Sequence, residues 1–162
     1  MTILDAERSF REGLVALLEA RHLDAVSCFD RAMKEERSRG GKLKMRYLSY
    51  YGLSVALGQG PTRDAIQACE LAARRDFFNP DLLLNLGKVY VMAGRRSRAL
   101  ETLESGLKLD PAHKGLLAAM HRTNRRRLSP VSWLTRAHPV NYWLGKVRSG
   151  RGRSPRQVTI RP

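Results

Sequence analysis

The segment from residue 83 to residue 111 has small, aromatic and proline residues at spacings that leave few folds open. Leu86 and Tyr90 are separated by about one helical turn and predict an apolar stripe along one helix. Gly87 is a small residue on the same helix, where a second helix can approach closely. Gly94 follows at the predicted helix end and can turn the chain with a positive φ. The segment therefore predicts a hairpin of two antiparallel helices.

Two upstream segments repeat this order of positions, which indicates an array of similar hairpins. In the segment from 83 to 111, Ala99 is the small residue of the second helix and Pro111 closes the unit. The matching positions upstream are Gly52, Gly60, Ala65, Cys69 and Ala72 in one segment, and Gly13, Ala25, Phe29 and Ala32 in the other. The spaced small, aromatic and proline positions resemble the tetratricopeptide repeat (TPR) family, as found in small bacterial TPR proteins.

The resemblance implies an all-α fold, an α-solenoid of three TPR-like helical hairpins followed by a capping helix and a largely irregular basic tail. The expected repeats are 5–37, 45–79 and 80–111, the capping helix is 112–127, the repeat domain is 1–127 and the tail is 128–162. Three departures from a regular repeat are expected. Residues 38–44 form a longer loop, the turn before Ala65 has one extra residue, and three extra residues precede Pro80. His22 is placed in the first turn.

Charge is distributed unevenly along the chain. The net charge is +15, from 30 Lys and Arg against 15 Asp and Glu, and residues 113–162 contain no acidic residue. The repeats are therefore close to neutral, and the C-terminal third is cationic. Such a segment is attracted to nucleic acid, to anionic lipid or to an acidic protein surface.

The resemblance to TPR proteins also implies peptide or protein binding in a concave groove lined by the first helix of each repeat. The groove residues implied by position are Phe10, Arg11, Leu14, Arg46, Tyr50, Leu53, Asn85, Lys88, Arg122 and Arg126. Asn85 falls where relatives that grip peptide backbones or terminal carboxylates often carry asparagine. The mixture of basic and aromatic residues favours a partner with acidic and apolar residues. The leading hypothesis is a non-enzymatic adaptor.

The tail leaves three interpretations open: docking on protein, binding of nucleic acid, and contact with an anionic membrane, the last being the least favoured. The docking residues would be Trp133, Tyr142, Trp143, Leu144 and Val147. The polyanion contacts would be Arg125, Arg127, Arg136, Lys146, Arg148, Arg151, Arg153 and Arg156. Arginines with interleaved aromatic residues suit phosphates and stacked bases. The alternative function is therefore a nucleic-acid- or ribosome-associated protein, and a homo-oligomer stays open.

No catalytic or cofactor motif is found. The four histidines are His22, His113, His121 and His138, and none has ligand spacing to a cysteine or a second histidine. Cys28 and Cys69 are expected to be small buried hydrophobic residues rather than a disulfide. The N-terminal segment has no apolar signal sequence, and no apolar run is long enough to span a membrane. We expect a cytoplasmic protein that is not an enzyme and uses neither a metal nor a cofactor.

Overall fold

The computed structural model describes residues 4–124, and these residues form helices with no β-strand among them. The helices are α1 (Leu4–Leu18), α2 (His22–Ser38), α3 (Met45–Gln59), α4 (Arg63–Arg75), α5 (Pro80–Met92), α6 (Arg96–Leu109) and α7 (Lys114–Asn124). The predicted all-α hairpin array is confirmed. The longer loop is also confirmed, because α2 ends at Ser38 and α3 begins only at Met45.

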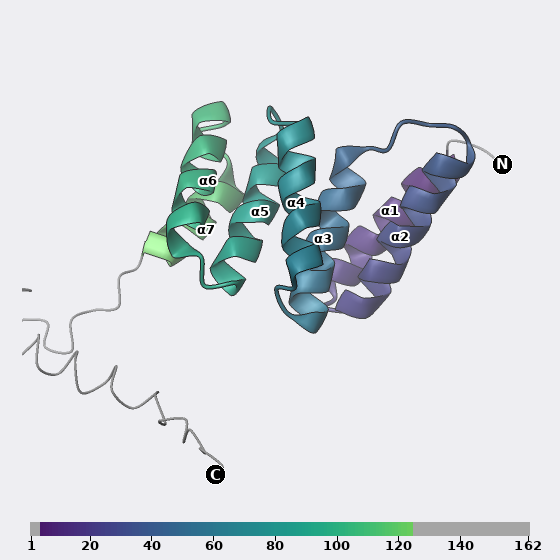
Figure 1. Cartoon of the computed structure of the whole chain (residues 1–162), viewed down its shortest axis with the longest axis horizontal. Coiled ribbons are helices and arrows are strands. Elements are labelled where there is room, and N and C mark those ends of the chain that lie inside the picture. The colour runs from purple at the N-terminus through teal and green to yellow at the C-terminus, as the bar shows by residue number, and fades with distance from the viewer. Residues whose placement is uncertain (1–3, 125–162) are drawn as a thin grey trace, which may run out of the picture. The chain divides into compact units, whose positions relative to one another are not determined.

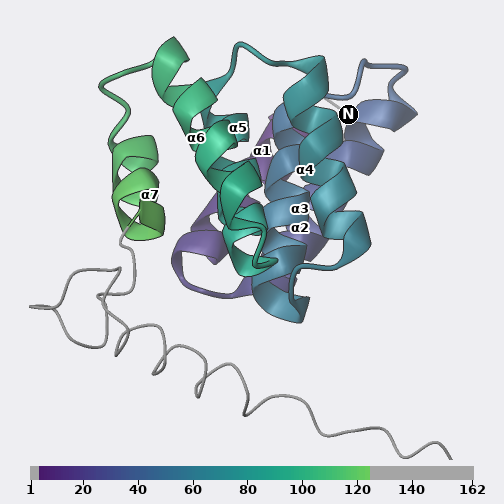
Figure 2. The same ribbon diagram turned by 60° about the vertical axis from the view of Figure 1, so that its left-hand side comes forward.

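The helices stack side by side in chain order, as Figure 1 shows. Each odd-numbered helix from α1 to α5 packs against the even-numbered helix that follows it, and α7 packs against α6. The odd-numbered helices also contact one another, α3 with α5 and α5 with α7. Figure 2 shows the same arrangement from a second direction, with α6 in front of α5. The odd-numbered helices therefore form one layer, the inner layer, and α2, α4 and α6 form the outer layer.

Close helix crossings explain the repeated glycines. A Cβ on Gly87 would lie 2.6 Å from Leu103 Cδ2 of α6, and a Cβ on Gly13 would lie 2.6 Å from the Phe29 ring of α2. Distances of this size are well inside van der Waals contact, so a side chain at either position would displace Leu103 or the Phe29 ring from its packed place. The structure confirms that these positions are small because two helices meet there.

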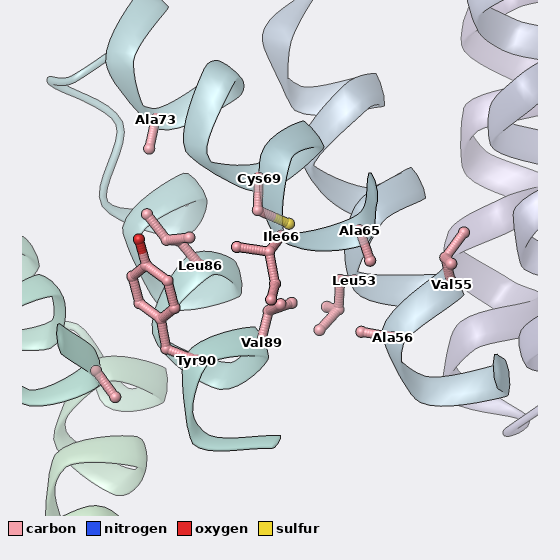
Figure 3. Close-up of a cluster of buried hydrophobic side chains, with 11 residues drawn as sticks. Leu53, Val55, Ala56, Ala65, Ile66, Cys69, Ala73, Leu86, Val89 and Tyr90 are labelled. Carbon is pink, nitrogen blue, oxygen red and sulfur yellow. The ribbon is translucent and has the colours of Figure 1, made fainter. Parts of the chain in front are cut away.

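The buried apolar side chains fall into three clusters spaced along the stack. The central cluster joins α3, α4, α5 and α6, and Figure 3 shows Ile66 of α4 pointing toward Leu53 of α3 and Val89 of α5. Each hairpin thus covers its apolar face with the next hairpin, which is how a solenoid gains stability. The domain is therefore stabilised by contacts between neighbouring hairpins rather than by one core common to all the helices.

The expectation of three extra residues before Pro80 is wrong. The interval from Ala65 to the start of α5 at Pro80 equals the interval from Ala99 to the start of α7 at Lys114. The two prolines are therefore not equivalent. Pro80 is the first residue of a helix, where the missing N–H costs nothing. Pro111 lies in the loop before a helix, at the position that Phe77 occupies in the preceding repeat.

The first turn also differs from its prediction. His22 is the first residue of α2, and the turn residue in the left-handed region is Ala20, with φ of 58°. Gly94 occupies the same place before α6, with φ of 71°, and confirms its predicted role. Alanine is strained in this region because its Cβ approaches the following carbonyl.

We therefore expect Ala20→Gly to stabilise the protein by about 0.5–1 kcal/mol, since relief of strain exceeds the entropic cost of glycine. In thermal unfolding this corresponds to a rise in Tm of about 2–4 °C. Ala20→Val, which adds branching at the same φ, should lower the Tm. A lower Tm for Ala20→Gly would show that the turn is not strained.

Candidate binding groove

The inner layer presents the residues that the sequence placed in a groove, but two of them are buried. Phe10 and Leu53 are only 5% and 3% exposed. Phe10 packs against the rings of Phe29 and Tyr47, with centroid separations of 5.5 and 4.9 Å. Leu53 belongs to the central cluster. The assignment of these two residues to the groove surface is therefore wrong, because neighbouring helices cover both.

Arg46 lies on the inner layer, but its charge is already neutralised. Its guanidinium pairs with the Glu7 carboxylate of α1 and lies 5.0 Å from the centre of the Phe10 ring. The Tyr47 hydroxyl donates to the same carboxylate at 3.0 Å. Arg46 therefore joins α1 to α3 and covers Phe10. Of the other residues assigned to α1, Arg11 is exposed and Leu14 is half-buried.

Asn85 links α5 to α3 beneath the surface. The side chain is 2% exposed, and its Nδ2 donates to Ser49 Oγ at 3.2 Å. The neighbouring Tyr50 is half-buried. Burial raises the pKa of the Tyr50 hydroxyl, the Asp81 carboxylate raises it further, and the Asn85 amide opposes the shift. Asn85 is thus a buried polar link between α5 and α3 and offers almost no surface to a ligand.

An acidic residue that the sequence reasoning missed lies at the centre of the inner layer. Asp81, in the first turn of α5, accepts a hydrogen bond from His113 Nε2 at 3.1 Å. His113 Nδ1 accepts from the Leu116 backbone N–H, so its proton is on Nε2 and it caps the start of α7. The sequence analysis identified no partner for His113, and the structure places the Asp81 carboxylate beside it. Asp81 occupies the same helical position as Arg46 in the preceding repeat, which is the signal that could have found it.

Two cations lie on the inner-layer helices that hold Asp81 and His113. Lys88 of α5 and Arg122 of α7 both reach solvent, and neither forms a salt bridge within residues 4–124. Partial burial lowers the pKa of the Lys88 ammonium, Asp81 opposes this, and the charge of Arg122 lowers it further. The two cations are thus close enough to repel each other.

Exposed leucines lie on the other two helices of the inner layer, toward the other end of the stack. Leu18 of α1 is 87% exposed and Leu57 of α3 is 41% exposed. The two hold the same position relative to the crossing glycines Gly13 and Gly52. The inner layer therefore offers apolar contacts on α1 and α3 and charged contacts on α5 and α7.

The described part of the chain offers no constellation for catalysis. Within residues 4–124, no three His, Cys, Asp or Glu side chains come together in a way that could hold a metal ion. Both cysteines are unpaired, Cys28 half-buried and Cys69 buried. Burial raises the pKa of the Cys69 thiol to about 12, so the sulfur stays protonated and is a poor nucleophile. None of the described helices combines the length and apolar character needed to cross a membrane.

The remaining assigned residues lie outside the described residues. They are the groove residue Arg126, the docking residues Trp133, Tyr142, Trp143, Leu144 and Val147, and the polyanion contacts Arg125, Arg127, Arg136, Lys146, Arg148, Arg151, Arg153 and Arg156. His138 lies there too.

Comparison with known proteins agrees with the fold. Residues 56–121 match the family model of the tetratricopeptide repeat. The chain therefore contains tetratricopeptide repeats, and residues 4–124 have the TPR fold. A search of curated proteins found no match.

Several solved TPR domains are similar in structure but distant in sequence. The TPR domain of Arabidopsis OM64 has a TM-score of 0.60 and 20% identity, covering 74% of this chain and 93% of that one. The Sgt2 TPR domain from Aspergillus fumigatus has a TM-score of 0.61 and 14% identity, covering 96% and 88%. The second TPR domain of human RPAP3, solved with an HSP70 peptide, has a TM-score of 0.60 and 15% identity, covering 76% and 98%. At these identities the likeness concerns the fold.

Proposed function

We propose that the protein is a non-enzymatic adaptor that holds a peptide or protein partner in the groove of the inner layer. The observation that carries the proposal is the pair of cations, Lys88 and Arg122, which repel each other and have no salt-bridge partner within residues 4–124. A carboxylate placed between them would relieve the repulsion and accept charge-assisted hydrogen bonds. The Asp81 carboxylate, which also accepts a hydrogen bond from His113, offsets part of this positive charge, so the two cations leave an excess of positive charge for an acidic partner.

The partner inferred from this surface has acidic and apolar residues. Its acidic group would meet Lys88 and Arg122, and its apolar residues would meet the exposed Leu18 and Leu57. The structural neighbours support peptide binding as the general role, since RPAP3 TPR domains were solved with an HSP70 peptide and an HSP90 peptide.

The proposal gives the basic tail a secondary role. Its arginines and aromatic residues would add a second contact, to the same partner or to an anionic surface. Nucleic-acid binding through the tail is the alternative function, and the basis for it is the composition of the tail. The two unpaired cysteines favour a reduced compartment, and the proposal places the adaptor in the cytoplasm.

Charge reversal in the groove tests the adaptor function. The Lys88→Glu, Arg122→Glu double variant should lose the proteins captured by the full chain, because an acidic partner would then meet two carboxylates. The matched control is Arg95→Glu with Arg96→Glu, which changes the net charge equally at exposed positions outside the inner layer. Capture is read by quantitative mass spectrometry after nuclease treatment. Equal capture by the groove variant and the wild type would contradict the proposal.

A further inference from the structure

The outer layer contains an open cavity between α4 and α6, on the opposite side of the domain from the groove. Its volume is about 660 Å³. Leu83, Leu86 and Tyr90 of α5 contribute apolar surface to its lining. Since α5 belongs to the inner layer, these side chains are reached from outside through the gap between α4 and α6.

Two adjacent phenylalanines project beside this cavity. Phe77 and Phe78 lie in the turn after α4, are 57% and 71% exposed, and have ring centroids 4.0 Å apart. Phe77 also lines the cavity. A pair of exposed aromatic rings beside an apolar cavity is the kind of surface that marks protein interaction sites. The outer layer therefore has a projection, formed by the Phe77 and Phe78 rings, directly beside the cavity between α4 and α6.

The rim of the cavity has equal numbers of both charges. Glu70 and Arg74 come from α4, and Arg98 and Glu101 come from α6. None of these four side chains forms a salt bridge within residues 4–124, although Glu70 accepts a hydrogen bond from Tyr90. A ligand of a single charge would leave half of the rim repelled. A surface with the same two charges would match it.

We propose that the occupant of this cavity is a second copy of the chain, in a two-fold symmetric dimer. In such a dimer the same patch is used by both subunits, so the projection of each copy can enter the cavity of the other. Phe78 is the side chain that enters, and the acidic and basic rim residues of one copy meet basic and acidic ones of its partner. The rings of Phe77 and Phe78 are then removed from water on both copies.

The dimer interface and the groove lie on different layers, so this inference does not rest on the proposed function. Dimerisation through α4 and α6 leaves both inner layers open. The particle would then present two grooves, and a partner with two binding segments would be held more tightly than by one groove.

The dimer is tested on the full chain by sedimentation velocity over a range of concentrations. The wild type should shift from monomer to dimer as concentration rises. Phe78→Asp should raise the dimer dissociation constant at least about thirtyfold, the effect of losing an interface hot spot. Leu23→Asp, which changes a 58% exposed apolar side chain of α2 outside the cavity lining, is the control and should leave the dissociation constant unchanged. A wild type that stays monomeric, or a dimer that Phe78→Asp leaves intact, would overturn the proposal.

Charge-reversed variants of the cavity rim test independently whether a second copy of the chain occupies the cavity. An acidic variant carries Arg74→Glu with Arg98→Glu, and a basic variant carries Glu70→Lys with Glu101→Lys. Each variant alone should be monomeric, because like charges then face each other, whereas an equimolar mixture should form heterodimers. Circular dichroism confirms that each variant is folded. Folded variants that dimerise as well alone as in the mixture would exclude this interface.

Discussion

Replacing Phe29 with alanine is expected to lower the free energy of unfolding by about 3–5 kcal/mol. Phe29 of α2 is fully buried and packs against Phe10 of α1 and Tyr50 of α3, with ring centroids 5.5 and 5.8 Å apart. Its ring also covers Gly13, where no side chain is available to fill the space that alanine would leave. The loss would be measured by chemical denaturation.

Leu18→Ala is the control for this substitution. Leu18 ends the neighbouring helix and is 87% exposed, so its truncation should change stability by less than about 0.5 kcal/mol. Losses of similar size for Phe29→Ala and Leu18→Ala would mean that the first hairpin is not packed as described.

Gly52→Val is expected to cost about 3 kcal/mol, because it overfills the crossing of α3 and α4. A Cβ at this position would lie 2.8 Å from the Ala65 backbone oxygen and 2.8 Å from Cys69 Sγ. The backbone oxygen belongs to a helix and cannot rotate away, so the two helices must separate. Thermal unfolding of the full chain measures the effect.

Gly58→Val makes a matched comparison in the same helix. A Cβ on Gly58 would approach only side chains, those of His22 and Leu23, at 3.3 Å. These distances are about 0.5 Å longer than those at Gly52, so this variant should be less destabilised than Gly52→Val. If the two variants unfold at the same temperature, the close crossing of α3 and α4 is not what requires glycine at residue 52.

The helical array could be predicted from the sequence because its determinants are local. Gly13, Gly52 and Gly87 recur at the helix crossings, and Gly94 supplies a turn. These residues act through the local backbone and through the adjacent helix, so their spacing in the sequence is enough to predict where the helices cross and turn. The wrong alignment of Pro80 with Pro111 arose because proline is compatible both with a first helical position and with a loop.

The groove could not be predicted to the same extent, since its surface depends on how successive hairpins stack. Phe10 and Leu53 have the expected positions on their helices, but neighbouring helices cover them. The bond between Asp81 and His113 joins residues that are 32 positions apart in the sequence. A contact between residues so far apart cannot be predicted from the spacing of residues within one helix or one repeat. Lys88 and Arg122 lie on α5 and α7, the helices expected from the repeat, and their role in binding stays a prediction.

The two proposed contact surfaces lie on the two layers of the domain. The inner layer has a cation pair on α5 and α7 and exposed leucines on α1 and α3. The outer layer has two exposed phenylalanines beside a cavity with balanced charges. Variants on one layer should therefore leave the function of the other intact, which allows partner binding and dimerisation to be measured separately.

The central claim, that Lys88 and Arg122 select an acidic partner, is tested most directly by fluorescence anisotropy with two pools of labelled heptapeptides. One pool combines Glu and Leu and the other combines Lys and Leu. The full chain is compared with its Lys88→Glu, Arg122→Glu variant and with the Arg95→Glu, Arg96→Glu control, so the basic tail is the same in all three. The wild type and the control should bind the acidic pool, and the groove variant should bind it at least about thirtyfold more weakly. Equal affinity of all three proteins for the acidic pool would contradict the account.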